Sequence, residues 1–159
     1  MENILSFQKI LIAVDDSVYS HKAAAYGFSL ARKFNAEVAL VQINEFPVSA
    51  NMTGDPLLGD PGIVVPNILE IQKESSERLF QSLKQEFGEG INIHEFIMEG
   101  SVTDEVIKVA KDFNASLIVV GTHSRTGLSH LFSGSVSETI SRHSTCPVLI
   151  VPNKDEEAE

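Results

Sequence analysis

The sequence has a single cysteine among 159 residues, so it cannot form an internal disulfide. This shortage is compatible with a reducing compartment. The one thiol, Cys146, precedes Pro147 at the start of a short apolar run. Such a position favours a buried structural thiol over a reactive nucleophile.

Basic residues are also scarce, since 12 Lys and Arg stand against 22 Asp and Glu, for a formal net charge of −10. Nucleic-acid backbones are bound by basic patches, so this balance argues against a nucleic-acid partner. Long apolar runs are absent too, and the acidic start of the chain lacks the basic region of a secretory signal. We therefore expect a cytoplasmic protein with no membrane association.

The two common phosphate-binding loops are missing. No Gly-x-Gly-x-x-Gly occurs in the chain, and no glycine loop has the Walker spacing with a following Lys-Ser/Thr pair. An apolar content of 43% with 21% charged residues is typical of a globular protein, and the length suits one domain. The sequence thus predicts a single domain over residues 1–159.

Apolar runs alternate with amphipathic segments along the chain. The continuous run Lys9–Asp15 predicts a strand buried on both faces, and the stripe after it predicts a helix over 18–34. The same patterns predict strands at 37–43, 91–98, 115–120 and 148–151, and helices at 67–87, 101–113 and 135–143. This alternation predicts an α/β fold with a Rossmann-like, open, doubly wound sheet of five parallel strands in the order 3-2-1-4-5.

Periodicity also predicts the orientation of individual side chains. Residues 91–98 alternate apolar and polar positions, which predicts a half-exposed edge strand with His94 facing solvent. Ser101 followed by Asp104 has the form of a capping box at the start of the third helix. The predicted inward stripe of the second helix is Ile68, Ile71, Leu79, Leu83 and Phe87.

Two stretches lack this periodicity. Residues 44–66 contain four prolines and three glycines, which predicts a mobile loop beside the ligand edge of the sheet. Residues 153–159 carry one lysine and four acids, which predicts a frayed acidic tail.

Two segments with binding chemistry follow the ends of strands. Asp15 closes the first strand, and the small-residue stretch Gly121–Ser135 follows the fourth. Ser135 with Glu138 has the form of a capping box, so a helix should start there with backbone N–H groups that attract a phosphate. The predicted strand order brings both segments to one topological switch point. The residues alone also allow a simpler reading, in which Asp15 and Ser135 are only caps.

Residues 117–152 resemble the C-terminal signature of the universal stress protein family. Members that bind ATP carry Gly, two residues, Gly, nine residues, Gly and then Ser or Thr. Gly121, Gly134 and Ser135 match this motif with its nine-residue gap intact, while Ser124 replaces the middle glycine.

The resemblance implies bound ATP, with Mg²⁺ accompanying the triphosphate. It implies that Asp15 contacts the ribose and is the candidate metal contact, that Val41 holds the adenine through its backbone, and that Ser135 holds phosphate. The full implied set of nucleotide-binding residues is Ala13, Val14, Asp15, Val41, Met98, Gly100, Val120, Gly121, Thr122, Ser124, Gly134, Ser135 and Val136.

The resemblance also implies a homodimer, because the last strand of this family commonly pairs across a two-fold axis. The corresponding apolar edge is formed by Val148, Leu149, Ile150 and Val151. The alternative is an edge protected by the acidic tail. The function implied is a stress-response module whose nucleotide switches its dimer surface. Ser124 favours another reading, a nucleotide-free dimeric interaction protein, and the absence of a catalytic set points to slow ATP hydrolysis at most.

Overall fold

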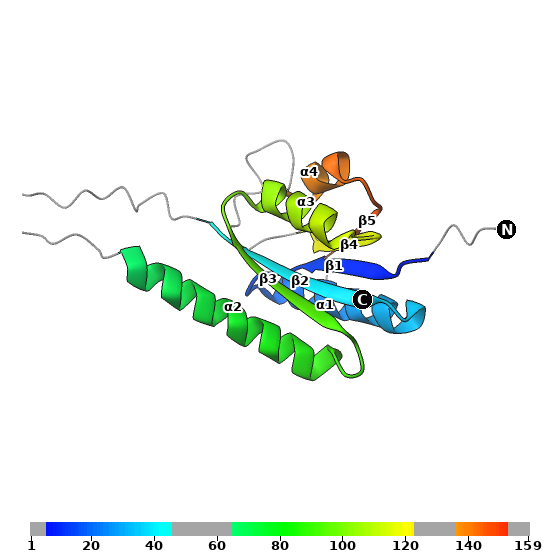
Figure 1. The fold of residues 1–159 in the computed structure, drawn as a ribbon, viewed down its shortest axis with the longest axis horizontal. Helices are drawn as coiled ribbons and strands as arrows, with labels where there is room; N and C mark the ends of the chain where they lie inside the picture. Colours follow the sequence, from blue (N-terminus) through cyan, green and yellow to red (C-terminus); the bar gives the residue numbers. More distant parts are fainter. Residues whose placement is uncertain (1–5, 46–64, 123–135, 153–159) are drawn as a thin grey trace, which may run out of the picture.

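A computed structural model describes residues 6–45, 65–122 and 136–152 of the chain. Its elements are β1 (Lys9–Ala13), α1 (Val18–Phe34), β2 (Glu37–Asn44), α2 (Val65–Phe87), β3 (Ile93–Glu99), α3 (Val102–Phe113), β4 (Leu117–Gly121), α4 (Val136–His143) and β5 (Val148–Val151). All strands pair in parallel, in the order β3-β2-β1-β4-β5 (Figure 1). The predicted α/β fold and strand order are confirmed.

Helices α1 and α2 cover one face of the sheet, and α3 and α4 cover the other (Figure 1). Alternate side chains of the central strands enter two separate cores, because successive residues of a strand point to opposite faces. The first core includes Ile12, Leu40, Phe28 and Phe80, and the second includes Leu11, Val41, Val106 and Ile140. None of the helices in the described part of the chain combines the length and apolarity that a membrane span requires.

Helix α1 lies very close to β1. A Cβ atom on Gly27 would be 2.5 Å from Cδ1 of Ile12, so a residue without a side chain is needed at this contact. The helix begins after Ser17, whose side chain accepts from the N–H of Ser20, and ends at Asn35 in a left-handed conformation with φ 53°. The first turn of α1 is thereby fixed beside the end of β1.

Several element boundaries lie one or two residues from the predicted ones, and two of these differences have a clear local cause. Strand β1 ends at Ala13, because Asp15 instead bonds to the start of α1. Helix α2 begins at Val65 and contains Pro66, which fits the first turn because N–H groups there have no intrahelical partner. The predicted loop over 44–66 is shortened at both ends. Residues 46–64 and the predicted acidic tail over 153–159 lie outside the described residues.

Two side chains, those of Ile71 and Ser101, differ from the sequence predictions. Ile71 is 65% exposed, since the N-terminal part of α2 extends past the sheet (Figure 1). The His94 side chain is 41% exposed on the edge strand, and its Nε2 lies 2.8 Å from Oε2 of Glu37. Ser101 is the N-cap residue of α3, but its side chain makes no capping hydrogen bond, so that capping box is wrong.

Candidate functional site

The carboxyl edge of the sheet contains a topological switch point. Strands β1 and β4 are hydrogen-bonded neighbours, yet the chain continues from β1 toward β2 and from β4 toward β5. Open α/β sheets bind their ligands at such a point. Ala13 and Gly121 are the last residues of the two strands, and both are half-buried. We refer to this region as the carboxyl-edge site.

Asp15 is bound to the first turn of α1. Its Oδ1 accepts from the backbone N–H of Ser17 at 2.9 Å, from the Ser17 hydroxyl, and from the Ser20 hydroxyl at 2.8 Å. The Asp15 N–H donates in turn to Ser20 Oγ at 2.7 Å. These bonds form a turn that leads into α1, whose N-cap residue is Ser17, and the predicted contact of Asp15 with a ribose stays a prediction.

Val41 uses its backbone within the sheet. Its carbonyl accepts from the N–H of Val14 at 2.9 Å, one residue past the end of β1. Its side chain is 0% exposed in the core beneath α3. Neither the carbonyl nor the side chain is therefore well placed to contact a ligand at the carboxyl-edge site.

The backbone of β2 points alternately to its two neighbouring strands, as in any strand of a parallel sheet. Glu37 and Val41 bond toward β1, whereas Val38 and Asn44 bond toward β3. Ile43 is the next residue on the β1 side, and it lies beyond the last β1–β2 bond. Its N–H and C=O groups therefore face the carboxyl-edge site.

Strand β3 reaches the same edge. Met98 is the register partner of Ile43, and the N–H of Gly100 donates to the Asn44 carbonyl at 3.2 Å. Gly100 has a φ of 128°, which residues with a side chain rarely adopt. This bend leads directly into α3 and lies beside Ile43, and the predicted contact of Met98 and Gly100 with a nucleotide stays a prediction.

The other side of the site comes from β4 and α4. Val120 is 4% exposed, whereas Gly121 and Thr122 are half-buried. The N–H of Thr122 donates to the Val151 carbonyl at 3.1 Å, which joins the end of β4 to β5. Val136, the first residue of α4, is 39% exposed.

Three implied residues lie outside the described part of the chain: Ser124, Gly134 and Ser135. Their contacts therefore stay predictions. Helix α4 begins at Val136, the position after the predicted cap. Glu138, the second residue of that predicted capping box, lies in the first turn and pairs with Arg142 at 2.6 Å.

Sequence reasoning offered Ser17 and Ser20 as helix-cap candidates but did not connect them with Asp15, and it missed Ile43. The Ser-x-x-Ser spacing after Asp15 was a local signal for the first two, because serine is a preferred helix cap. Ile43 carried no signal by residue type, since only its backbone is involved. No group of three or more potential metal-ligating side chains occurs within residues 6–45, 65–122 and 136–152.

A model of the universal stress protein family matches residues 6–152. Universal stress protein MJ0531 of Methanocaldococcus jannaschii is 32% identical over 152 residues, covering 95% of this chain and 85% of the relative. Universal stress protein YxiE of Bacillus subtilis is 31% identical over 146 residues, covering 91% and 99%.

Solved structures agree with the fold. Protein MJ0577 superposes with a TM-score of 0.75 at 22% identity, covering 96% of this chain and 100% of that one. A universal stress protein in complex with cAMP gives 0.70 at 19%, covering 92% and 98%. The Archaeoglobus fulgidus protein in complex with dAMP gives 0.59 at 19%, covering 92% and 98%. At these identities the likeness shows the fold alone.

Proposed function

The chain belongs to the universal stress protein family, and we propose that it binds an adenine nucleotide at the carboxyl-edge site and acts as a nucleotide-dependent dimeric switch. ATP is the proposed nucleotide, with Mg²⁺ carried by its phosphates. The complexes of two structural neighbours with cAMP and dAMP support the adenine nucleotide class.

The observation that carries the proposal is the backbone of Ile43 beyond the end of β1. Adenine presents an amino donor beside a ring-nitrogen acceptor, which complements a backbone C=O and N–H. Because the carbonyl of Val41 already accepts from Val14, we assign the base contact to Ile43. Met98 and Gly100 flank this position on the β3 side.

The phosphates are proposed to lie at the start of α4. The free N–H groups of a helix N-terminus attract anions, and Gly134 and Ser135 directly precede this helix. Asp15 is proposed to contact the ribose, from the opposite side of the switch point, and is the candidate protein contact for Mg²⁺. The sugar would then lie between the ends of β1 and β4.

The dimer is proposed to form through β5. This strand is at the edge of the sheet, and Ile150 is 36% exposed. An apolar edge strand is a template for pairing with another chain. The bond from Thr122 to Val151 links the carboxyl-edge site to this edge, which supports coupling between nucleotide and dimer.

Calorimetric titration of Mg·ATP into refolded, ligand-free protein tests the nucleotide site. We expect a dissociation constant on the order of micromolar, lost in Gly134→Val, where a side chain would obstruct the phosphates. Absence of binding at millimolar ATP would contradict the proposal.

A second candidate is a nucleotide-free dimeric interaction protein. Ser124 favours it, because a β-carbon stands where ATP-binding members have glycine. This candidate is supported if the wild-type protein does not bind ATP and the Ser124→Gly variant does. Slow ATP hydrolysis, if observed, belongs to this protein only if replacing Asp15 and Ser135 lowers the rate.

A further inference from the structure

The outer face of α3 forms one side of a surface groove, and α4 forms the other. The groove has a volume of about 470 Å³ and is lined by Thr103, Asp104, Ile107, Lys108, Lys111, Asp112, Thr139 and His143. The opposite face of α3 packs on the sheet through residues such as Val106 and Val109. The groove therefore lies on the side of α3 that faces away from the sheet.

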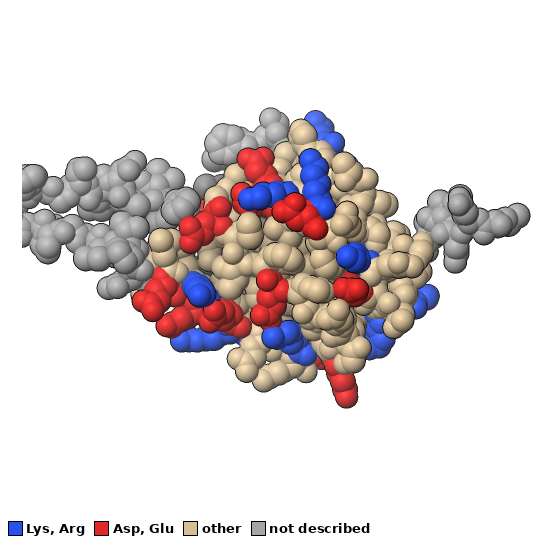
Figure 2. All heavy atoms as spheres, viewed as in Figure 1, with Lys and Arg blue, Asp and Glu red and all other residues tan. Residues whose placement is uncertain are grey.

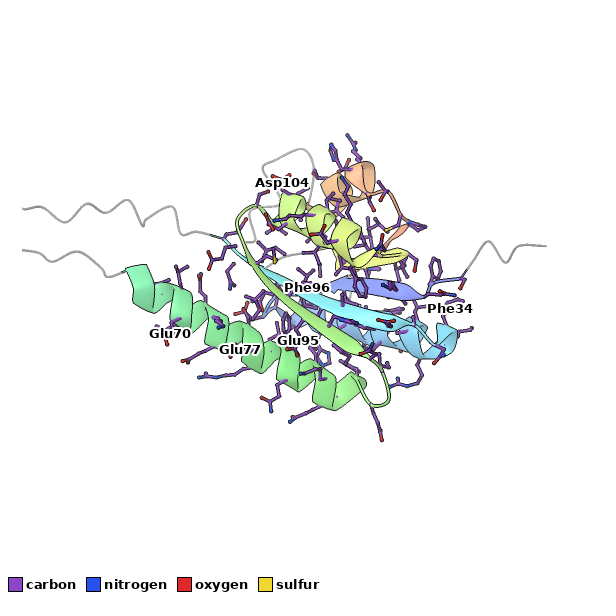
Figure 3. The ribbon with its side chains drawn as sticks, in the orientation of Figure 1. Phe34, Glu70, Glu77, Glu95, Phe96 and Asp104 are labelled. Atoms are coloured by element: carbon purple, nitrogen blue, oxygen red, sulfur yellow. The ribbon has the colours of Figure 1, made fainter. Side chains whose placement is uncertain are left out.

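Within the described residues, most charged side chains of this face have no ion-pair partner. Asp104, Lys111 and Asp112 are exposed and form no ion pair with another residue in the described ranges. Lys108 has only a 3.7 Å contact between its Nζ and Oε2 of Glu105. Acidic and basic side chains alternate over this region in Figure 2, and Asp104 lies on the outer side of α3 in Figure 3.

The order of these residues is self-complementary. Consider a second copy of α3 that lies antiparallel to the first, with a two-fold axis between Ile107 and Lys108. Each acidic residue that lines the groove faces a basic or hydroxyl residue of the other helix. Asp104 then faces Lys111 of the second copy, and Lys111 faces Asp104. The same operation places the hydroxyl of Thr103 opposite the carboxylate of Asp112, and the aliphatic stem of Lys108 on Ile107.

The helix dipoles favour the same arrangement. Asp104 is in the first turn of α3 and Lys111 in the last, so an antiparallel pair brings the acidic N-terminal end of one helix to the basic C-terminal end of the other. The groove beside α3 gives the second helix a place to lie between α3 and α4, as ridges of one helix fill grooves of another.

We propose that this groove is a homotypic interface in which α3 of one copy lies antiparallel to α3 of a second copy, with paired contacts between Asp104 and Lys111. The interface is separate from the β5 edge and does not depend on nucleotide. An isologous contact of this kind meets the symmetry requirement of a closed two-fold assembly.

The contact is small. Helix α3 has 12 residues and is about 18 Å long, so the interface falls at or below the roughly 1,200 Å² that marks weak complexes. On its own it gives a weak dimer. If β5 also pairs, each subunit has two different interfaces, and the α3 contact joins β5-paired dimers into tetramers or longer chains. Within a closed tetramer the α3 contact is strengthened, because its two helices are held at a high effective concentration.

Sedimentation velocity over a concentration series, from about micromolar to about millimolar protein, tests the proposal with charge variants. Asp104→Lys and Lys111→Asp each replace two attractive contacts by two repulsive ones, so each weakens association by about tenfold or more. The double variant Asp104→Lys with Lys111→Asp restores the attraction in reversed order and should return association to the wild-type range. Added salt should weaken the wild type and the double variant alike.

Matched controls lie on α2. Glu70→Lys and Lys73→Asp make the same charge changes on an exposed helix outside the groove, and Figure 3 shows Glu70 projecting away from the sheet. They should leave association unchanged. Ile150→Asp, which disrupts the β5 edge, should remove only the assembly formed through that edge, so the two interfaces are distinguished. The proposal is overturned if the single variants associate like the wild type, or if the double variant fails to recover.

Discussion

The backbone N–H of Thr122 donates to the carbonyl of Val151 at 3.1 Å. This bond joins the end of β4, where the nucleotide is proposed to bind, to the last residue of the edge strand proposed to form the dimer. A ligand that fixes the backbone at Gly121 and Thr122 would therefore also fix the end of β5. The proposed coupling thus has a direct covalent and hydrogen-bonded route.

The first prediction concerns this coupling. ATP should slow hydrogen exchange at the amide of Thr122 and at the amides of β5, and should change the dimer dissociation constant by about fivefold or more. Hydrogen exchange with mass spectrometry and sedimentation, with and without ATP, measure the two effects. If ATP binds but the dimer dissociation constant does not change, the proposed switch is contradicted, whereas the proposed nucleotide site is not.

The second prediction concerns Ile43. Ile43→Pro removes the N–H proposed to bind adenine, so ATP affinity should fall by about tenfold or more. Ile43→Val keeps the backbone groups and a β-branched side chain and should bind ATP like the wild type. Calorimetry measures both affinities, and circular dichroism shows whether the proline variant folds. Equal affinity in a folded Ile43→Pro variant would place the base elsewhere.

The third prediction concerns the choice of base. The Ile43 carbonyl accepts from the adenine amino group, whereas inosine presents a carbonyl oxygen at that position, and two acceptors would face each other. ITP should therefore bind at least about a hundredfold more weakly than ATP, as expected where a buried polar group is left unpaired. Competition of the two nucleotides for one fluorescent ATP analogue measures this ratio. Similar affinities would argue that the site reads only sugar and phosphate.

The fourth prediction concerns the cap of α1. Ser17→Ala removes the hydroxyl that caps the helix and bonds Asp15, so the free energy of unfolding should fall by about 1 kcal/mol. Ser75→Ala, at an exposed site within α2, is the control and should change stability little, because alanine is a good helix former. Urea unfolding followed by circular dichroism compares the two. Equal stabilities would mean that the Ser17 N–H and the Ser20 hydroxyl fix the Asp15 turn without help from the Ser17 hydroxyl.

The fifth prediction concerns the close contact of α1 with β1. A Cβ on Gly27 would lie 2.5 Å from Ile12 Cδ1, so Gly27→Ala should destabilise the fold by about 1–3 kcal/mol, although alanine normally favours a helix. Adding Ile12→Val, which deletes Cδ1, should cost less in the Gly27→Ala background than in the wild type. A double-mutant cycle in urea measures this coupling, and strictly additive effects would contradict the contact.

Most of the fold could be predicted from local patterns. The run from Ile10 to Ile12 is apolar on both faces, and these residues are fully buried in the structure, as a central parallel strand requires. The prediction of buried side chains failed where a helix extends beyond the sheet on which it packs. Ile71 belongs to the apolar stripe of α2 but is exposed, because hydrophobic periodicity does not report how far the sheet extends beneath a helix.

The site was less predictable. Met98 and Gly100 reach the predicted edge, but Asp15 is also occupied with Ser17 and Ser20. The backbone position implied for Val41 is taken by Val14, and Ile43 stands where backbone groups face the site. An offset of two residues along a strand preserves every side-chain pattern, since side chains repeat with a period of two.

By itself the sequence determined the alternation of strands and helices, and with it the parallel sheet and its ligand edge, because buried runs, amphipathic stripes and caps are local properties of the chain. The tertiary structure alone decided which backbone groups remain available at that edge. That choice depends on the register that sets Ala13 opposite Val41, and on where β1 ends. The order of charged residues along α3 is likewise a property of the sequence. Their outward orientation, on which the proposed contact with a second copy depends, follows from the packing of the other face of α3 on the sheet.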